Sequence, residues 1–177
     1  AAGFARTSLW WGPPEALFDQ GRLDDAPRMA RDLGLHVEYL HPPAHDCNEL
    51  WSPVAAARGR FVDRHRRWID DCARHGVRQL VIHVVFGIEG PGAGRDGLEA
   101  LRAVTRHARQ ADVVVAVENT RRDELARYAL ERIDEPHLAF CYDSSHDWLW
   151  GEPYLGMLRQ FGHRLVQTHL SDTWHGS

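Results

Sequence analysis

The sequence predicts an α/β fold in which parallel strands alternate with helices. Two apolar runs, residues 81–85 and 113–117, are almost continuous and rich in β-branched side chains, as in strands covered on both faces. Amphipathic segments lie between the runs, and this alternation favours a parallel sheet with helical crossovers. The strands are expected at residues 5–10, 37–41, 79–85, 113–118, 138–142 and 165–170.

The segments between the predicted strands carry helix signals. An acidic turn at residues 24–27, with Pro27 near its start, should open the first helix, and Gly34 should end it. Gly76 should end the second helix and Gly162 a short last one. No change in composition divides the chain, so a single domain over residues 1–177 is expected. The apolar stripes of the later helices are Phe61, Trp68 and Cys72; Leu98, Leu101, Val104 and Ala108; Leu125, Ala129 and Ile133; and Tyr154, Leu158 and Phe161.

The composition limits the classes of partner. An apolar fraction of 44% and a charged fraction of 26% are typical of a soluble globular domain. A net charge of −4 gives little support for a nucleic-acid partner, since such binding depends on basic contacts to phosphates. No apolar run approaches the roughly 18 residues of a membrane span. Cys47, Cys72 and Cys141 are odd in number and lack metal-type spacing, which favours reduced thiols and a cytoplasmic location.

Metal-ligating residue types recur at the carboxyl ends of five consecutive predicted strands. They are His41, His83, Glu118, Asp143 with His146 three residues later, and His169. Parallel strands bring these ends to one rim, where imidazoles and carboxylates can converge on a divalent ion. A carboxylate such as Glu118, at the end of an apolar strand, needs a cation or another polar partner. The pattern therefore predicts a metal site.

Each of these residues also has a simpler explanation when it is taken alone. His83 could be a hydrogen-bonded core histidine, and His41 could line the proline turn that follows it. Glu118 could pair with the arginines that follow it, and Asp143 could cap a turn. It is the joint pattern that favours a metal site over these separate roles.

Five stretches at the strand ends carry a further signal. They are Leu40-His41-Pro42-Pro43, Val81-Ile82-His83, Val115-Ala116-Val117-Glu118-Asn119, Tyr142-Asp143-Ser144-Ser145-His146 and Thr168-His169-Leu170-Ser171-Asp172. Together they resemble the xylose-isomerase-like barrels, a superfamily with sugar-phosphate isomerases and epimerases, inosose dehydratases and the endonuclease IV group. The resemblance implies a (β/α)8 TIM barrel and a divalent-metal-dependent sugar or sugar phosphate isomerase or epimerase of carbohydrate metabolism.

The resemblance also implies roles for single residues. Glu118, Asp143 and His169 would hold a divalent metal (Mn, Co, Mg or Zn), which polarises a carbonyl or hydroxyl of a small polyol. Glu118 and His146 would be catalytic. Glu118 would move a proton at the carbon next to the carbonyl, and His146 would hold a substrate oxygen or a second metal.

Other residues would support this chemistry. His41 and His83 match positions that bind additional metals or substrate, and Asp172 would orient His169 from behind, as Asn119 would support its neighbouring ligand. The loops after the strands are rich in tryptophan, and flat aromatic faces suit the C–H surfaces of sugars. Candidates for such stacking are Trp10, Trp51 and Trp148.

The sequence departs from the barrel pattern at both ends. The family has a strand before residue 5, and an eighth strand whose glutamate is both a metal ligand and a catalytic base, and neither is found here. The Asp-x-His element expected after His169 is missing as well. We therefore expect about six βα units of an eightfold barrel, a piece of a protein of about 250 residues.

Three other interpretations remain open. Residues 92–97 form G-x-G-x-x-G with Glu118 about 20 residues further on, which imitates a dinucleotide-binding fold, but residues 86–91 separate the motif from its strand. A zinc phosphodiesterase on abasic DNA, of the endonuclease IV kind, would use the same histidines, although the acidic net charge argues against it. A barrel kept only for binding is the third. A homo-oligomer is compatible with all of them.

Overall fold

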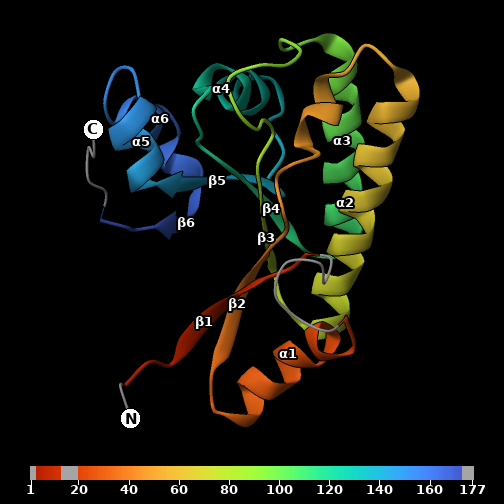
Figure 1. Cartoon of the computed structure of the whole chain (residues 1–177), viewed down its shortest axis with the longest axis vertical. Helices are drawn as coiled ribbons and strands as arrows, with labels where there is room; N and C mark the ends of the chain where they lie inside the picture. Colours follow the sequence, from red (N-terminus) through yellow and green to blue (C-terminus); the bar gives the residue numbers. More distant parts are fainter. Residues whose placement is uncertain (1–2, 13–19, 173–177) are drawn as a thin grey trace.

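A computed structural model describes residues 3–12 and 20–172 of the chain. Six strands form one parallel sheet in chain order, which curls into an open half-barrel (Figure 1). Each neighbouring pair is parallel, as the alternation of strands and helices predicted. The strands are β1 (Arg6–Trp10), β2 (His36–His41), β3 (Gln79–Ile82), β4 (Val114–Glu118), β5 (Leu138–Asp143) and β6 (Leu165–His169).

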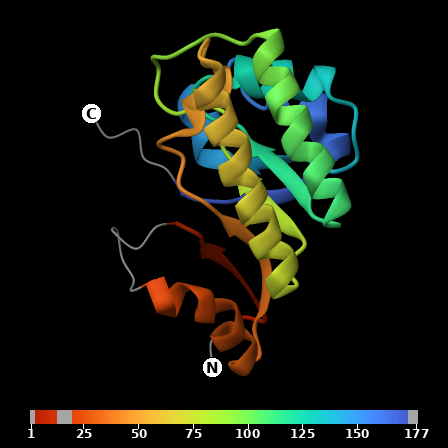
Figure 2. The ribbon, with the colours of Figure 1, turned by 90° about the vertical axis from the view of Figure 1, so that its right-hand side faces the viewer.

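The helices lie on the outer side of the curled sheet. Figure 2 shows the two longest, α2 and α3, side by side in front of the strands. The helical elements are α1 (Gln20–Asp32), η1 (Cys47–Trp51), α2 (Ala55–His75), α3 (Arg95–Gln110), α4 (Asp123–Arg132), α5 (Ser144–Trp150), α6 (Gly156–Phe161) and η2 (Gly162–Arg164). None of the helices in the described residues is long and apolar enough to cross a membrane.

Alternation along the strands separates the two faces of the sheet. The main core lies between the outer face and the helices, where Val117 of β4 is fully buried. The inner face carries a smaller buried cluster of Val81, Ala116 and Cys141. Glu118 follows Ala116 by two residues, so its side chain lies on the same inner face, at the carboxyl end of the strand.

The first helix differs from its prediction. α1 already includes Gln20, and Pro27 lies inside it rather than near its start. Of the two acids mistaken for a first turn, Asp24 contacts Arg74 of α2 at 3.3 Å, while Asp25 contacts the mid-helix Arg28 at 3.1 Å, as does Asp32. Such pairs three and four residues apart support a helix interior, which an acidic first turn imitates in sequence.

The second helix keeps most of its predicted face. Phe61 and Cys72 are buried as expected, but Trp68 is only half-buried. His65 takes its place, stacked on Phe61 at 3.8 Å, with its Nδ1 2.7 Å from the Phe61 carbonyl oxygen. Burial lowers the pKa of His65 to about 3, so this imidazole packs as a neutral core residue. Gly76 ends the helix in a left-handed conformation, as predicted.

The glycine motif at residues 92–97 serves packing in this fold. Gly97 lies in the first turn of α3, where a Cβ atom would stand 2.3 Å from the Trp51 ring and 2.9 Å from the Leu50 carbonyl oxygen. The missing side chain thus lets η1 approach α3 closely. This accounts for the third glycine without a dinucleotide, and the Trp51 indole donates to the Val84 carbonyl oxygen at 2.7 Å just after β3.

Replacing Gly97 by alanine should destabilise the protein by about 1–3 kcal/mol, because the added methyl group overpacks the contact with Trp51. Urea unfolding followed by circular dichroism measures the effect. Gly59→Ala in α2 is the matched control, since its Cβ atom would meet nothing within 4 Å. That change should stabilise the protein by about 0.5–1 kcal/mol. Equal effects of the two substitutions would contradict the packing role of Gly97.

Candidate metal centre

The predicted strand-end residues meet in one cavity. It has a volume of about 450 Å³ and lies at the carboxyl ends of the strands. The parallel register explains the convergence, because Trp10 pairs with His41 and Asp143 pairs with His169 on adjacent strands. The lining residues are Trp10, His41, Pro43, Ala44, His45, His83, Phe86, Glu118, Asp143, His146 and His169.

Glu118 is the centre of this arrangement. Its side chain is 2% exposed, and each carboxylate oxygen faces two imidazoles. Oε2 lies 3.0 Å from Nε2 of His41 and 3.1 Å from Nε2 of His83. Oε1 lies 3.2 Å from Nδ1 of His146 and 3.2 Å from Nδ1 of His169. Four histidines from four different segments therefore share one buried carboxylate.

The charges of this cluster are strongly coupled. Burial would raise the pKa of Glu118, but hydrogen bonds from the four histidines, His146 foremost, outweigh it and hold the pKa far below its usual range. Burial likewise opposes the charged forms of His146 and His169. The neighbouring carboxylates nevertheless raise the pKa of both imidazoles, chiefly through Glu118 for His146 and Asp143 for His169. The cluster therefore favours positive charge beside an ionised Glu118.

Asp143 has two tasks, each carried by one of its oxygens. Oδ1 accepts the backbone N–H groups of Ser145 and His146 at 2.8 Å and so caps the start of α5. Oδ2 lies 3.6 Å from Nδ1 of His169. Hydrogen bonds from His169 and Ser145 lower the pKa of Asp143 although burial opposes them. The capping role considered from sequence is therefore present, and the second oxygen still faces the cavity through its approach to His169.

Asn119 ties β4 to the end of β5. Its side chain is fully buried, donates to the carbonyl oxygen of Asp143 at 3.0 Å and accepts the Asp143 N–H at 2.7 Å. Its own carbonyl oxygen lies 2.8 Å from Nδ1 of His146. Asn119 thus sets the positions of two site residues without facing the cavity itself.

The contacts of His41 and the spacing of the ligand atoms show whether these side chains fit a divalent ion. Nδ1 of His41 lies 3.0 Å from the carbonyl oxygen of Pro42, which places the ring proton there and leaves the Nε2 lone pair toward Glu118. A lone pair 3.0 Å from a carboxylate oxygen is repulsive unless a second proton or a cation lies between them. The donor set fits a cation. The sets of ligand atoms within 4.8 Å of one another are His41, His83 and Glu118; Glu118, Cys141 and His169; and Glu118, Asp143 and His146.

The tryptophans expected to stack on substrate have three different placements. Trp10 lines the cavity and stacks on His41, with ring centroids 5.3 Å apart. Trp51 ends η1 and is buried in the core against α3, so the prediction that it stacks on substrate is not supported. Trp148 is half-exposed and meets Tyr154 edge-to-face at 5.8 Å, and it is not among the described lining residues.

Two further contacts were not assigned from sequence. Phe86 lines the cavity from the loop after β3, and the Trp150 ring lies 5.3 Å from that of His146. Aromatic residues in loops that follow strands were the available signal.

Asp172 is exposed, and no hydrogen bond joins it to His169 in the part of the chain that the structure describes. Its role in orienting His169 stays a prediction.

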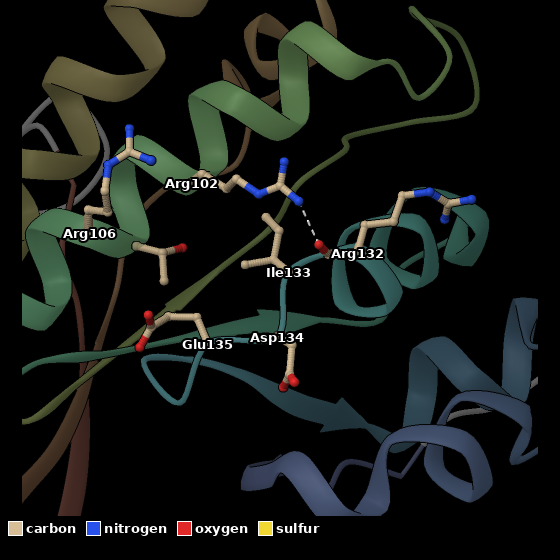
Figure 3. Close-up of a pocket in the computed structure, with 7 residues that line it drawn as sticks. Arg102, Arg106, Arg132, Ile133, Asp134 and Glu135 are labelled. Carbon is tan, nitrogen blue, oxygen red and sulfur yellow. Dashed lines mark hydrogen bonds between the residues drawn. The ribbon is translucent and has the colours of Figure 1, made fainter.

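A second cavity lies between α3, α4 and the loop that enters β5, at the opposite end of the strands (Figure 3). Its volume is about 350 Å³. Arg102 donates to the main-chain carbonyl oxygen of Arg132 at 2.7 Å, while Arg106 and Arg132 point away from each other. Asp134 and Glu135 stand at the same wall, so its charged groups do not converge as they do around Glu118.

Comparison with known proteins identifies the fold family. The model of the xylose isomerase-like TIM barrel matches residues 1–177. The chain belongs to the xylose isomerase-like TIM-barrel family. The family resemblance predicted from the strand-end stretches is thereby confirmed, as is the incomplete barrel of six βα units. A comparison with curated proteins finds no match.

Solved structures place this xylose isomerase-like chain among barrels of the same shape. D-psicose 3-epimerase from Clostridium cellulolyticum H10 aligns with a TM-score of 0.73 and 15% identity, over 94% of this chain and 63% of the epimerase. An L-ribulose 3-epimerase gives 0.72 and 21%, over 96% and 60%. The 3-keto-D-glucoside 4-epimerase of E. coli gives 0.70 and 15%, over 96% and 79%. The chain thus spans about three fifths of the length of the first two.

Removal of the Asn119 side chain should cost about 2–4 kcal/mol of unfolding free energy, because it leaves two buried backbone groups of Asp143 without partners. Urea unfolding of Asn119→Ala measures the loss. Asn48→Ala is the control, since Asn48 makes the same pair of bonds to the backbone of Phe86 on an exposed loop. It should cost about 1 kcal/mol or less. A cost for Asn119→Ala no larger than for Asn48→Ala would show that burial does not set the importance of the Asn119 bonds.

Proposed function

We propose that this barrel is a divalent-metal-dependent isomerase or epimerase of a small sugar, or sugar phosphate, acting in the cytoplasm by proton transfer next to a carbonyl. The observation that carries the proposal is the placement of Glu118, buried and shared by His146 and His169 on one oxygen and by His41 and His83 on the other. The epimerases that share its fold act on sugars, as their names state, and support the substrate class.

Glu118, Asp143 and His169 would hold the metal. Oε1 of Glu118 and Oδ2 of Asp143 both face Nδ1 of His169, at 3.2 and 3.6 Å. In the structure, the two carboxylates have ligand atoms within 4.8 Å of one another together with His146, so an ion shared with His169 would need these side chains to draw together. Two carboxylates and one imidazole suit Mn, Co, Mg or Zn. When bound there, the ion would stabilise the negative charge that develops on a substrate oxygen.

The residues of the chain would then move and place protons. Glu118 is ionised, as a general base must be, and would accept a proton from the carbon next to the substrate carbonyl. The four imidazoles that lower its pKa also weaken it as a base, so proton transfer would require some of these contacts to open when substrate binds. Nδ1 of His146 faces the carbonyl oxygen of Asn119, which leaves Nε2 free to hold a substrate hydroxyl or carbonyl oxygen. Glu118 and His146 therefore keep the separate catalytic roles proposed for them.

The walls of the cavity suit a sugar ring or chain. Trp10 and Phe86 present half-exposed aromatic surfaces beside the polar cluster, which matches a molecule with C–H faces and hydroxyl edges. Seven of the eleven residues that line the concave site are His, Asp or Glu, and most of them converge on Glu118. A small polyol fits this arrangement better than a nucleic-acid backbone, for which the chain offers a net charge of −4.

Glu118→Gln should lower Mn²⁺ affinity at least about 100-fold, because the amide keeps the shape of the side chain but removes the charge that the cation needs. Isothermal titration with Mn²⁺ measures the affinity. The same variant should abolish deuterium incorporation from D2O at the carbon next to the carbonyl of a turned-over ketose, followed by NMR.

The control for this test is Glu38→Gln in β2. Glu38 pairs with the exposed Arg6 at 2.6 Å and does not line the cavity. It should retain both metal binding and exchange. Unchanged metal affinity in Glu118→Gln would refute the metal site, while metal binding without turnover of any tested sugar or sugar phosphate would favour a barrel used only for binding.

A phosphodiesterase is the second candidate function, and one observation favours it. His41 and His83 face Oε2 of Glu118 at 3.0 and 3.1 Å, so these two imidazoles and Glu118 would offer donors for a further ion beside the one held with Asp143. A site with two or more metals suits phosphate-ester hydrolysis. The number of bound ions separates this candidate from the isomerase.

The isomerase proposal predicts one strongly bound ion per chain by elemental analysis after dialysis. His83→Ala should keep that ion, whereas His169→Ala should lose it, since His169 faces both Glu118 and Asp143 while His83 faces Glu118 alone among the described residues. Two or more zinc ions in the unmodified protein, with one lost in His83→Ala, would instead support the phosphodiesterase.

A further inference from the structure

Cys141 lies directly beneath the proposed metal centre and has no part in the function proposed so far. It is fully buried on the inner face of β5, in the small cluster with Val81 and Ala116. In the parallel register it stands opposite Glu118 of β4, so the two side chains leave adjacent strands on the same face. The protein's other two thiols, Cys47 and Cys72, belong to the outer core.

The position of the thiol completes a set of ligand atoms. The sulfur of Cys141, one oxygen of Glu118 and one nitrogen of His169 all lie within 4.8 Å of one another. Donors around a tetrahedral ion are about 3.3–3.6 Å apart, as follows from metal–nitrogen and metal–sulfur bonds of about 2.0–2.3 Å. A small inward movement of these side chains is enough to close the set on an ion.

His169 gives an independent sign that the hydrogen-bonding groups of this set are not all satisfied. Its Nδ1 faces Glu118 and Asp143, whereas its Nε2 is buried without a hydrogen-bond partner among the described residues. A buried imidazole nitrogen without a partner carries a desolvation cost that a ligand or a small turn of the ring can relieve. The ring can therefore serve a donor set deeper in the barrel than the one that includes Asp143.

We propose that Glu118, Cys141 and His169 form a second coordination set, which takes thiophilic divalent ions such as Zn²⁺, Cd²⁺ and Co²⁺ deeper into the barrel than the set with Asp143. Thiolates select such ions, whereas Mg²⁺ and Mn²⁺ prefer oxygen donors. On binding, the S–H bond of Cys141 breaks, a sulfur–metal bond forms and the proton passes to water. The inference rests on the proposed metal site, because the two sets share Glu118 and His169.

Sharing two ligands has a consequence for regulation. Both sets draw on the Glu118 carboxylate and the His169 ring, so an ion in the deeper set would pull these two side chains away from an ion held with Asp143. A thiophilic ion would therefore displace the ion held with Asp143 and withdraw Glu118 from substrate chemistry. Of the four ions considered for the set with Asp143, Mn²⁺ and Mg²⁺ would then support the proposed reaction, whereas Co²⁺ and Zn²⁺ would be drawn to the deeper set.

Titration of the chain with Co²⁺, followed by ultraviolet absorption, tests the proposal directly. A cobalt–thiolate bond gives a charge-transfer band in the near ultraviolet that oxygen and nitrogen ligands do not give. We expect this band in the unmodified chain and in Cys72→Ser, the control with a buried thiol in the outer core. We expect it to be absent in Cys141→Ser.

Metal competition gives a second readout from the same variants. Cys141→Ser should bind Mn²⁺ as the unmodified chain does and lose at least about tenfold in Cd²⁺ affinity, since only the sulfur donor has changed. Asp143→Asn should have the reverse effect, weakening Mn²⁺ binding and keeping the cobalt band. If Cys141→Ser does not fold, Cys141→Ala repeats the test without a buried hydroxyl.

The outcomes separate this inference from the proposed function. Co²⁺ bound without a charge-transfer band, or a band that persists in Cys141→Ser and Cys141→Ala, would overturn the thiolate set and leave the metal site standing. Failure of the chain to bind either Co²⁺ or Mn²⁺ would overturn both. Loss of the band in the two Cys141 variants alone, with Mn²⁺ binding retained, supports the second set.

Discussion

The buried carboxylate of Glu118 requires positive charge beside it, and the mouth of the half-barrel is organised around this requirement. A charge at the end of an apolar strand is costly unless it is paired. Four imidazoles within 3.2 Å meet that need, and they come from the ends of β2, β3 and β6 and from α5. The site is thus a direct result of where β4 places its last residue.

The parallel sheet brings these polar side chains together without disturbing the hydrophobic core. The strand pairing places Glu118 opposite Cys141, and after a register shift at Phe140 it places Asp143 opposite His169. Their side chains form two layers on the inner face, with Glu118 and Cys141 in one layer and Asp143 and His169 in the next layer toward the carboxyl ends of the strands. The outer face holds the hydrophobic core, so polar groups can gather inside the curve without disturbing it.

Sequence reasoning found the strands and the site because both depend on local patterns. β-branched runs marked β3 and β4, and the carboxyl ends of parallel strands must share a rim. It failed where the outcome depends on packing. The start of α1 was misplaced because acids beside Arg28 imitate a first turn. The burial of Trp51 depends on the absent side chain of Gly97, which contacts it in space but belongs to a helix far away in the sequence.

Asp143 contacts both the start of α5 and the histidine cluster of the cavity, so the stability of this helix depends on the arrangement of the cluster. One oxygen holds the first N–H groups of α5, and the other faces His169. His146 sits in that first turn, so a helix that frays at its start would release an imidazole from the cluster, and a carboxylate drawn inward would loosen the helix. The short α5 and the ring of histidines therefore form or come apart as one cooperative unit.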